Sequence, residues 1–456
     1  MKKNPFSALS RRKFLASLSA LGIGYFILPR NSRAAATSPA TDVVDIAPVW
    51  AAQTVGFCLL THGDQQFVAF YDAQRQMTLA QRTLGSPDWK FKKLPSSVGW
   101  DSHNYVTMAL DRNNSLHVSG NMHAVPLVYF RGGEPLDIDS VEPVNRMVGN
   151  REQRVTYPRF YSGPDGELLF CYRDGSSGNG DNLINVFDEA SGTWRRYLDT
   201  PLMQGNGIMN AYMGGPKKGP DGYYNLTWVW RNSPDASTNH DLSYMRSLDL
   251  IHWETIDGKP VKLPVTIKTP GVIVDPVPVK GGILNGAGAV GFDLSGQPLI
   301  SYFKYDVRGN TQLYLARFEN GAWKHYQASN WDYRCDFSGG GSFVAPIRVG
   351  AVECQDGKMV ISFWHIKYGY GNRAIDPETM RLAAEVPKPR VAAESSKLDK
   401  VESSFPGMIV HWSPDLGTAS DGRKYRLRWE ALSQNRDRPR NPPWPPPSML
   451  RVVGTE

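Results

Sequence analysis

The sequence is poor in cysteine, with four residues in a chain of 456. Four cysteines allow three disulfide pairings, but they are too sparse to hold together a small disulfide-framework fold. The hydrophobic content of 41% is ample for an ordinary apolar core instead. Cys335 and Cys354 lie close enough in sequence to pair with each other, or to share a metal ion with nearby histidines.

The N-terminal region lacks an apolar run long enough to cross a membrane. The run from Phe14 to Leu28 has about 15 residues, short of the roughly 20 that a membrane-spanning helix needs. It follows the twin-arginine pattern Ser10-Arg-Arg-Lys-Phe-Leu15, and the small residues Ala34-Ala-Ala36 after it suit a cleavage site. We therefore expect residues 1–36 to be a twin-arginine signal peptide, and the mature protein to be periplasmic or secreted, without a stable membrane anchor.

The mature chain has no excess of charge of either sign. The formal charge of +7 comes from the predicted signal peptide, which carries basic residues and no acidic ones: Lys2, Lys3, Arg11, Arg12, Lys13, Arg30 and Arg33. The rest of the chain balances 44 basic side chains against 44 acidic ones. The composition therefore predicts no nucleic-acid partner, and an anionic ligand must be attracted by a local patch.

Beyond residue 50 the sequence has almost no convincing amphipathic helix. What recurs is a short apolar strand, a turn with Asp or Gly, and a second strand rich in Val, Tyr, Phe and Trp. Asp-Gly supplies the positive φ angles that a tight hairpin needs. The turns occur at Gly63–Gln66, Asp111–Asn114, Pro164–Glu167, Pro220–Gly222, Asp293–Gly296, Gln355–Gly357 and Ser420–Gly422.

This repeat predicts an all-β protein, a seven-bladed β-propeller, because radial repetition protects the edges of the sheets. We expect residues 37–456 to form this one catalytic domain, since no linker interrupts the repeat before Trp429; a pair of β-sandwiches is the alternative. The proline-rich segment Arg436–Pro447 is expected to be extended. The strand Met449–Val453 is then expected to close the last blade by pairing with Val43–Val49.

Two histidines stand at the two outer ends of one predicted hairpin. The two ends of a hairpin lie close together in space. His103 and His123 can therefore reach the same face. Asn104 and Asn121 flank them and are candidate substrate ligands. His117 lies between them, alternates with apolar neighbours, and is expected to be a structural strand residue.

Aromatic and basic residues continue this pattern on the next predicted strands. Tyr157 precedes a proline that marks a strand edge, and it is either a packing aromatic or a catalytic residue. Arg173 ends an apolar strand and suits two-point binding of a carboxylate. The glycine-rich loop after it lacks the Lys-Ser/Thr ending of a phosphate loop, so we expect no organic cofactor. Further candidate substrate ligands are Asn210, Tyr212 and Arg231.

Four other residues are of the types that bind zinc: His240, Cys335, Cys354 and His365. Their spacing matches no compact zinc motif, so a structural Zn²⁺ site would have to be assembled from separate blades. A disulfide between Cys335 and Cys354 is the alternative.

The motifs Asp101-Ser-His-Asn, Gly120-Asn-Met-His, Thr156-Tyr-Pro-Arg and Tyr172-Arg-Asp-Gly-Ser-Ser-Gly-Asn-Gly together resemble the BNR-4-repeat family. More narrowly, they are similar to the propeller ulvan lyases, and the resemblance runs from about Val44 to Trp429. It implies β-elimination at a 4-linked uronate in an anionic, sulfated polysaccharide. It further implies that His103 is the base, that Tyr157 is the acid and can serve as both, that Arg173 and His123 neutralise and hold the carboxylate, and that Tyr212 assists.

Two other functions remain open at this stage. A sialidase-like hydrolase would need three arginines that clamp a carboxylate and a Tyr–Glu pair, and other glycosidases need paired carboxylates. A non-catalytic lectin would need exposed aromatic platforms, for which Trp228-Val-Trp230 and Phe363-Trp-His365 are candidates. In each case we expect a monomer that binds carbohydrate.

Overall fold

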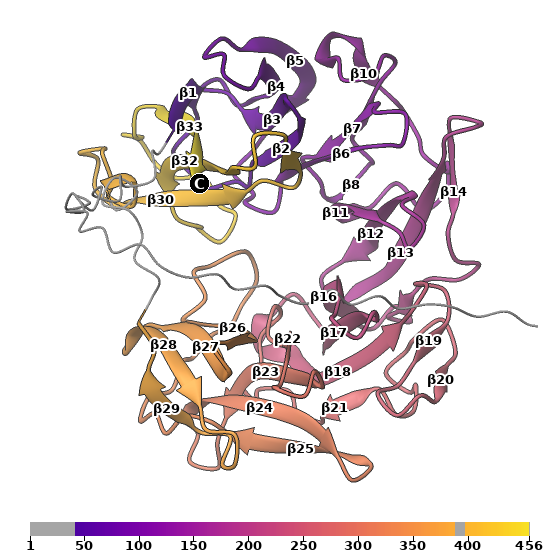
Figure 1. Cartoon of the computed structure of the whole chain (residues 1–456), viewed down its shortest axis with the longest axis vertical. Helices are drawn as coiled ribbons and strands as arrows, with labels where there is room; N and C mark the ends of the chain where they lie inside the picture. The colour runs from indigo at the N-terminus through magenta and orange to yellow at the C-terminus, as the bar shows by residue number, and fades with distance from the viewer. Residues whose placement is uncertain (1–41, 388–396, 456) are drawn as a thin grey trace, which may run out of the picture. The chain divides into compact units, whose positions relative to one another are not determined.

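The computed structural model describes residues 42–387 and 397–455, and within them the chain forms seven β-sheets in succession (Figure 1). The first sheet contains β2 (Cys58–Gly63), β3 (Gln65–Tyr71), β4 (Gln76–Thr83), β5 (Lys90–Ser97) and the short β31 (Thr418–Ala419). The second contains β6 (Val106–Leu110), β7 (Leu116–Gly120), β9 (Tyr129–Gly132) and β10 (Val141–Pro143). The third contains β8 (His123–Val125), β11 (Val155–Ser162), β12 (Leu168–Ser176), β13 (Asn179–Asp188), β14 (Thr193–Arg196) and β15 (Met203–Gln204).

The remaining sheets repeat this plan, and short 3₁₀ turns lie at η1 (Ile138–Ser140) and η2 (Ala236–Thr238). The fourth sheet contains β16 (Asn210–Lys218), β17 (Tyr224–Arg231), β18 (Asn239–Ser247), β19 (Trp253–Glu254), β20 (Pro260–Val261) and β21 (Ile273–Asp275). The fifth contains β22 (Ala289–Phe292), β23 (Pro298–Tyr305), β24 (Thr311–Glu319) and β25 (Ala322–Gln327), and the sixth β26 (Ile347–Gln355), β27 (Lys358–His365), β28 (Gly369–Ile375) and β29 (Leu382–Glu385). The seventh contains β30 (Met408–Pro414), β32 (Lys424–Leu432), β33 (Ser448–Thr455) and β1 (Asp42–Val49).

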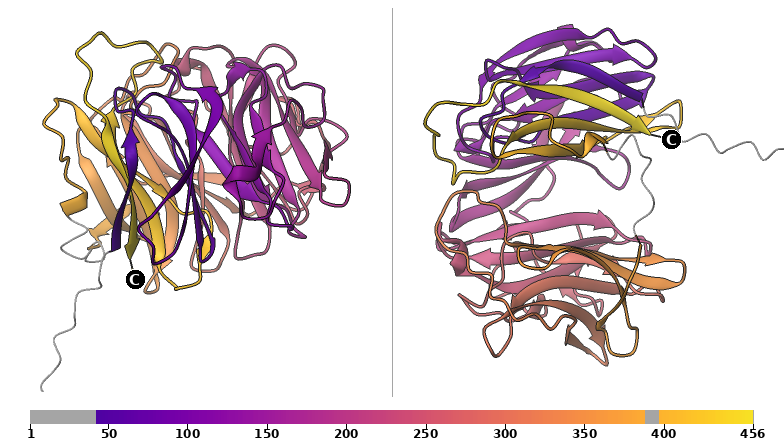
Figure 2. Two further views of the ribbon diagram at one scale, coloured as in Figure 1. Left: turned by 90° about the horizontal axis from the view of Figure 1, so that it is seen from above. Right: turned by 90° about the vertical axis from the view of Figure 1, so that its left-hand side faces the viewer.

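The seven predicted turns each lie between paired strands of a different sheet, as between β11 and β12 or β16 and β17. Gly166 and Gly222 have φ angles of 79° and 84° there, a conformation that glycine adopts without strain. The sheets stand side by side in chain order (Figure 2). The predicted seven-bladed propeller is therefore confirmed, and a pair of β-sandwiches is excluded.

The seventh sheet joins the two ends of the described chain. β1 pairs with β33 in antiparallel register, with Val43 opposite Val453 and Val49 opposite Ser448. Arg451 and Asp45 add an ion pair of 2.7 Å across the same two strands. The predicted pairing of the closing strand is confirmed, and residues 436–447 before it contain neither helix nor strand.

The core lies between neighbouring sheets rather than within one central layer. Side chains of the fourth sheet, for example, pack on one side against the third sheet and on the other against the fifth. Trp228 and Trp230 on β17 are completely buried in this way. They hold the sheets together and are not the exposed platforms that a lectin would need.

No helix in the described ranges is long and apolar enough to cross a membrane. The predicted signal peptide, residues 1–36, lies outside the described residues.

Candidate active site

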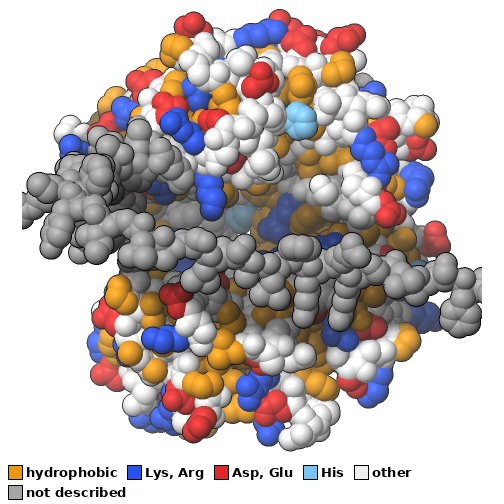
Figure 3. All heavy atoms as spheres, in the orientation of Figure 1, with side chains coloured by type: hydrophobic (Ala, Val, Ile, Leu, Met, Phe, Trp, Pro, Cys, Tyr) orange, Lys and Arg blue, Asp and Glu red, His pale blue; other side chains and the backbone are white. Residues whose placement is uncertain are grey.

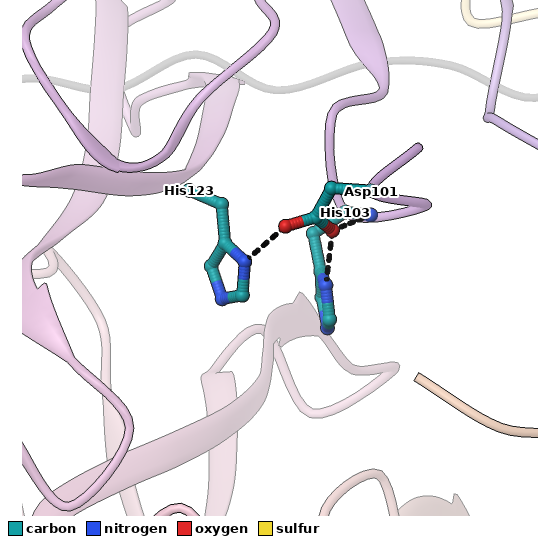
Figure 4. A group of neighbouring side chains, drawn as sticks. All are labelled: Asp101, His103 and His123. Carbon is teal, nitrogen blue, oxygen red and sulfur yellow. Dashed lines mark hydrogen bonds and ion pairs between the residues drawn. The ribbon is translucent and has the colours of Figure 1, made fainter. Parts of the chain in front are cut away.

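Asp101 holds two imidazole rings with its two carboxylate oxygens (Figure 4). His103 Nδ1 lies 2.7 Å from Oδ1, and His123 Nδ1 lies 2.5 Å from Oδ2. The ring centroids are 4.2 Å apart. Because both Nδ1 atoms are engaged by the carboxylate, Nε2 of each ring is left for a ligand in the cavity that both rings line.

A second carboxylate reaches His103 from the other end of the chain. Asp437 Oδ2 lies 3.4 Å from His103 Nδ1 and also accepts a hydrogen bond of 2.8 Å from the backbone N–H of Ser342. Burial disfavours the imidazolium, but the hydrogen bonds to Asp101 and Asp437 outweigh this effect and raise the pKa of His103 to about 9. His103 is therefore protonated at neutral pH.

Tyr157 occupies a β-bulge with a left-handed backbone. Its φ is 57°, and the β11–β12 register shifts between Thr156 and Arg159. A bulge re-aims a side chain, and positive φ in a bulky residue is a strained conformation that clusters at functional sites. The ring lies with its centroid 5.8 Å from that of His103 and 6.0 Å from that of Tyr212.

Strand register places Arg173 next to the side chains already described. Thr156 on β11 pairs with His123 on β8 at one side and with Arg173 on β12 at the other. Arg173 is 1% exposed, its guanidinium nitrogens are buried, and no carboxylate of the described residues pairs with it. Its charge faces the rings of Tyr157, at 4.9 Å, and Tyr212, at 5.5 Å. Burying a cation without a carboxylate partner costs free energy. The positive potential of Arg173 therefore favours the ionised forms of the two tyrosines beside it.

The two tyrosines respond to this field differently. Burial opposes ionisation of Tyr212, but Arg173 and Arg231 together with a hydrogen bond from Ser177 lower its pKa. The Tyr212 hydroxyl lies 2.7 Å from Ser177 Oγ and 3.4 Å from Arg231 Nη1. Tyr157 is governed by burial, which raises its pKa. Neighbouring groups with oppositely shifted pKa values are the usual arrangement of a base beside an acid.

These side chains line two adjoining cavities. The first, of about 390 Å³, is bordered by the two histidines, Asp101 and Asp437. The second, of about 270 Å³, extends past Arg173 to Arg159 and Asn182. Residues common to both linings join them into one cleft: His103, Tyr157, Tyr212 and Asn285. Basic and histidine side chains are visible in the hollow on this face (Figure 3).

The sequence profile of the BNR repeat-containing family matches residues 65–331. The chain belongs to this family. The predicted membership is thereby confirmed.

A curated relative and two solved structures extend the comparison. The ulvan lyase, short isoform, of Alteromonas sp. (strain LOR) is 28% identical over 149 residues, and the match spans 28% of each chain. The structure of the polysaccharide lyase Uly1 superimposes with a TM-score of 0.59 at 12% identity, covering 92% of this chain and 100% of that one. A PL25 ulvan lyase bound to -[GlcA(1-4)Rha3S]- gives 0.53 at 14% identity, covering 90% and 96%. At these identities the structural likeness shows a shared fold.

Within this family fold, the predicted histidines, tyrosines and arginines meet in one cleft. His103, His123, Tyr157, Arg173 and Tyr212 all line it, and Arg231 borders the larger cavity. His117 is fully buried between Asp111 and the Tyr129 hydroxyl, as expected of a structural residue.

The three predicted asparagine ligands border neither cavity. Asn121 turns toward β5, where its amide donates to Ser96 Oγ and to the Ser97 carbonyl. Asn104 lies in the loop after His103, and its backbone carbonyl accepts a hydrogen bond from Tyr71. Asn210 is buried and accepts a hydrogen bond from the backbone N–H of Gly178. This last contact positions the turn that carries Ser177, so Asn210 supports the cleft from beneath.

The predicted zinc ligands do not converge. Cys335 Sγ lies 3.5 Å from His365 Nε2, but the exposed Cys354 contacts the Phe292 carbonyl and His240 is engaged by Asp241 and Asn232. All four cysteines are free, so the alternative disulfide is absent as well. Cys354 and His365 lie on one sheet but at opposite ends of two paired strands, since Cys354 pairs with Met359 and His365 with Ile347. His240 lies on the fourth sheet.

Among the described residues, one group has its ligating atoms close enough for a metal ion: Asp101, His103 and His123, within 4.8 Å of one another. The same atoms form the hydrogen bonds of Figure 4. A metal ion would therefore have to displace the protons that now join the two rings to the carboxylate.

Several residues of the cleft were not predicted from sequence as part of the site. Asp101 stands two residues before His103, and this short spacing is a signal that it orients the ring. Ser177 lies in the turn between β12 and β13, on the same sheet as Tyr157 and Arg173, whereas Asn285 and Asp437 come from another blade and from the closing segment. No local pattern marks them, because their role arises only when the sheets are assembled.

Proposed function

We propose that the protein is a polysaccharide lyase that cleaves a 4-linked uronate, in a sulfated polymer such as ulvan, by β-elimination. The observation that carries this proposal is the buried Arg173, which has no carboxylate partner and faces Tyr157 and Tyr212 in the cleft that His103 and His123 also line. The similarity to an ulvan lyase over 28% of each chain supports it.

The reaction makes three demands on the site. A base must remove the C5 proton, positive charge must neutralise the carboxylate so that the enolate-like intermediate is stable, and an acid must protonate the leaving oxygen. We assign Tyr212 as the base, because its pKa is lowered by Arg173 and Arg231. Tyr157 keeps its proton and is assigned as the acid.

The family resemblance assigned the base to His103. A pKa of about 9 argues against that role, since the ring already carries its second proton at neutral pH. We propose instead that protonated His103, with His123 beside it, receives the substrate carboxylate at the open Nε2 atoms. Arg173 then acts mainly through the two tyrosines, because its nitrogens are shielded from the cleft.

The carboxylates of the cleft fit a hydrolase poorly. Asp101 and Asp437 border the larger cavity, and no glutamate occurs among the described residues that line either cavity. Burial works against both charges, but hydrogen bonds to the histidines prevail and lower the pKa of Asp101 and of Asp437. Neither carboxyl group is therefore suited to donate a proton, as a glycosidase acid must.

We also propose export by the twin-arginine route, with residues 1–36 as the signal peptide, and action as a monomer in the periplasm or outside the cell. An extracellular polymer is the substrate that such a location would supply. Nucleic acid is not expected as a partner, because the mature charge is balanced.

The test is an ultraviolet assay of purified protein with ulvan, a heparan-type polymer and pectin. Elimination produces an unsaturated uronate, so absorbance rises; hydrolysis yields reducing ends without it, and a lectin binds without either. We expect Tyr157→Phe and Tyr212→Phe each to lower kcat by about 100-fold or more, since each removes a proton-transferring group. Tyr223→Phe, which borders neither cavity, is the control. Full activity of both cleft variants would remove the tyrosines from the mechanism.

A further inference from the structure

Arg159 is a cation that faces the smaller cavity and is not used by the proposed elimination. It lies on β11, two residues after Tyr157, and lines the cavity with its side chain exposed. No carboxylate pairs with it in the described part of the chain. It thus differs from Arg173, whose nitrogens are shielded by two tyrosine rings.

Two phenols hold the Arg159 guanidinium in place. Tyr105 and Tyr161 interact with it through their hydroxyl oxygens. Each hydroxyl donates its own proton elsewhere, Tyr105 to the Pro158 carbonyl at 3.0 Å and Tyr161 to the Gly215 carbonyl at 3.0 Å. The guanidinium is therefore fixed by neutral acceptors and keeps its full charge for a ligand.

The wall of this cavity is suited to an anion. The described residues that line it include two arginines, His103 and no Asp or Glu. Uncompensated positive charge within a low-dielectric wall attracts oxyanions more strongly than the same charge on an open surface.

We propose that Arg159 binds a second oxyanion of the polysaccharide, a sulfate ester or carboxylate on the sugar next to the one that is cleaved. This inference rests on the proposed lyase function. Tyr157 and Arg159 project from one strand into one cleft, so a polymer whose uronate meets Tyr157 presents its neighbouring sugar to Arg159. The residue then selects polymers with charged groups on adjacent sugars.

The test compares ulvan with ulvan from which the sulfate esters have been removed chemically, using kcat/KM from the ultraviolet assay. Arg159→Gln should lower kcat/KM on native ulvan by about 10- to 100-fold, the usual effect of losing one charged hydrogen-bonding partner. Arg159→Lys should give an intermediate loss, because it keeps the charge without the planar fork. Arg195→Gln on the outer strand β14 removes an equal charge far from the cleft and should change nothing.

The pattern of losses identifies the anion. A loss confined to native ulvan assigns Arg159 to sulfate, and an equal loss on both polymers assigns it to a neighbouring carboxylate. No loss on either, in variants whose thermal unfolding matches wild type, overturns the inference. If wild type releases no unsaturated uronate at all, the proposed function fails, and calorimetric binding of ulvan oligosaccharides decides this inference separately. Binding weakened by Arg159→Gln then supports it, and unchanged binding overturns it.

Discussion

Replacing Asp437 with asparagine is the sharpest test of how the cleft controls its histidine. The substitution removes a negative charge from the neighbourhood of His103 and keeps an oxygen that accepts the hydrogen bond from Ser342. The substitution therefore changes the charge around His103 at neutral pH, where the ring is protonated and the neighbouring carboxylates are ionised. The expected result is a lower pKa for His103 with little change in the shape of the site.

The size of the effect follows from the distance and the exposure of the pair. Two unit charges 3.4 Å apart interact by roughly 5 kcal/mol at an effective dielectric constant of about 20. The side chains of His103 and Asp437 remain 21% and 12% exposed, so water screens part of this interaction. We expect a fall of about 1 to 2 pKa units, which corresponds to about 1.4 to 2.7 kcal/mol.

The assay is the pH dependence of kcat/KM for elimination. The pKa of His103 is raised, so its protonated form is present at neutral pH and is lost as the pH rises through about 9. Activity of wild type should therefore decline on the alkaline side near that value, and the decline should move to lower pH in Asp437→Asn. Asp336→Asn, an exposed acid paired with Arg334, is the control. An alkaline limb that stays in place or moves upward would refute the assignment of the charge to His103.

Two further predictions concern the fold and the cysteines. Deleting residues 448–456 removes β33, which leaves β1 without a partner and β32 paired only with β30, so we expect loss of cooperative urea unfolding rather than a modest shift of its midpoint; an unchanged midpoint would show that the seventh sheet does not need this strand. Thiol titration without reductant should detect Cys354 rapidly in the native protein and all four cysteines after denaturation, and fewer than four would reveal a disulfide.

Local chemistry explains why the fold was predictable from the sequence. Each blade carries its own Asp- or Gly-containing turn, and a turn of that kind determines which two strands pair without reference to the rest of the chain. The pairing of β1 with β33 was predictable for a related reason, because a propeller has one place for strands from both ends. The strand bounds and the additional short strands, such as β15 and β31, arise from contacts between blades and have no such signal.

The site was predictable only in part, because some of its features arise from contacts between blades that leave no local signal in the sequence. His103 and His123 stand at or near strand ends, and Tyr157 and Arg173 lie within the neighbouring strands β11 and β12, so blade order alone gathers them. The bulge at Tyr157 and the buried position of Arg173 depend on register, which the motifs do not encode. Asp437 is contributed by a segment more than three hundred residues away from His103. The predicted zinc ligands do not meet, because they were chosen by residue type alone, with no spacing to support them.

The pairing of the first described strand with the last has a consequence for synthesis of the protein. β1 is translated early, but its partner β33 is translated only after the strands of the other six sheets. Six sheets can form on the nascent chain, because their neighbours are close in sequence, whereas the seventh must wait with an exposed strand edge. The seventh sheet is therefore the last to be completed, and until then the unpaired edge of β1 is exposed to aggregation.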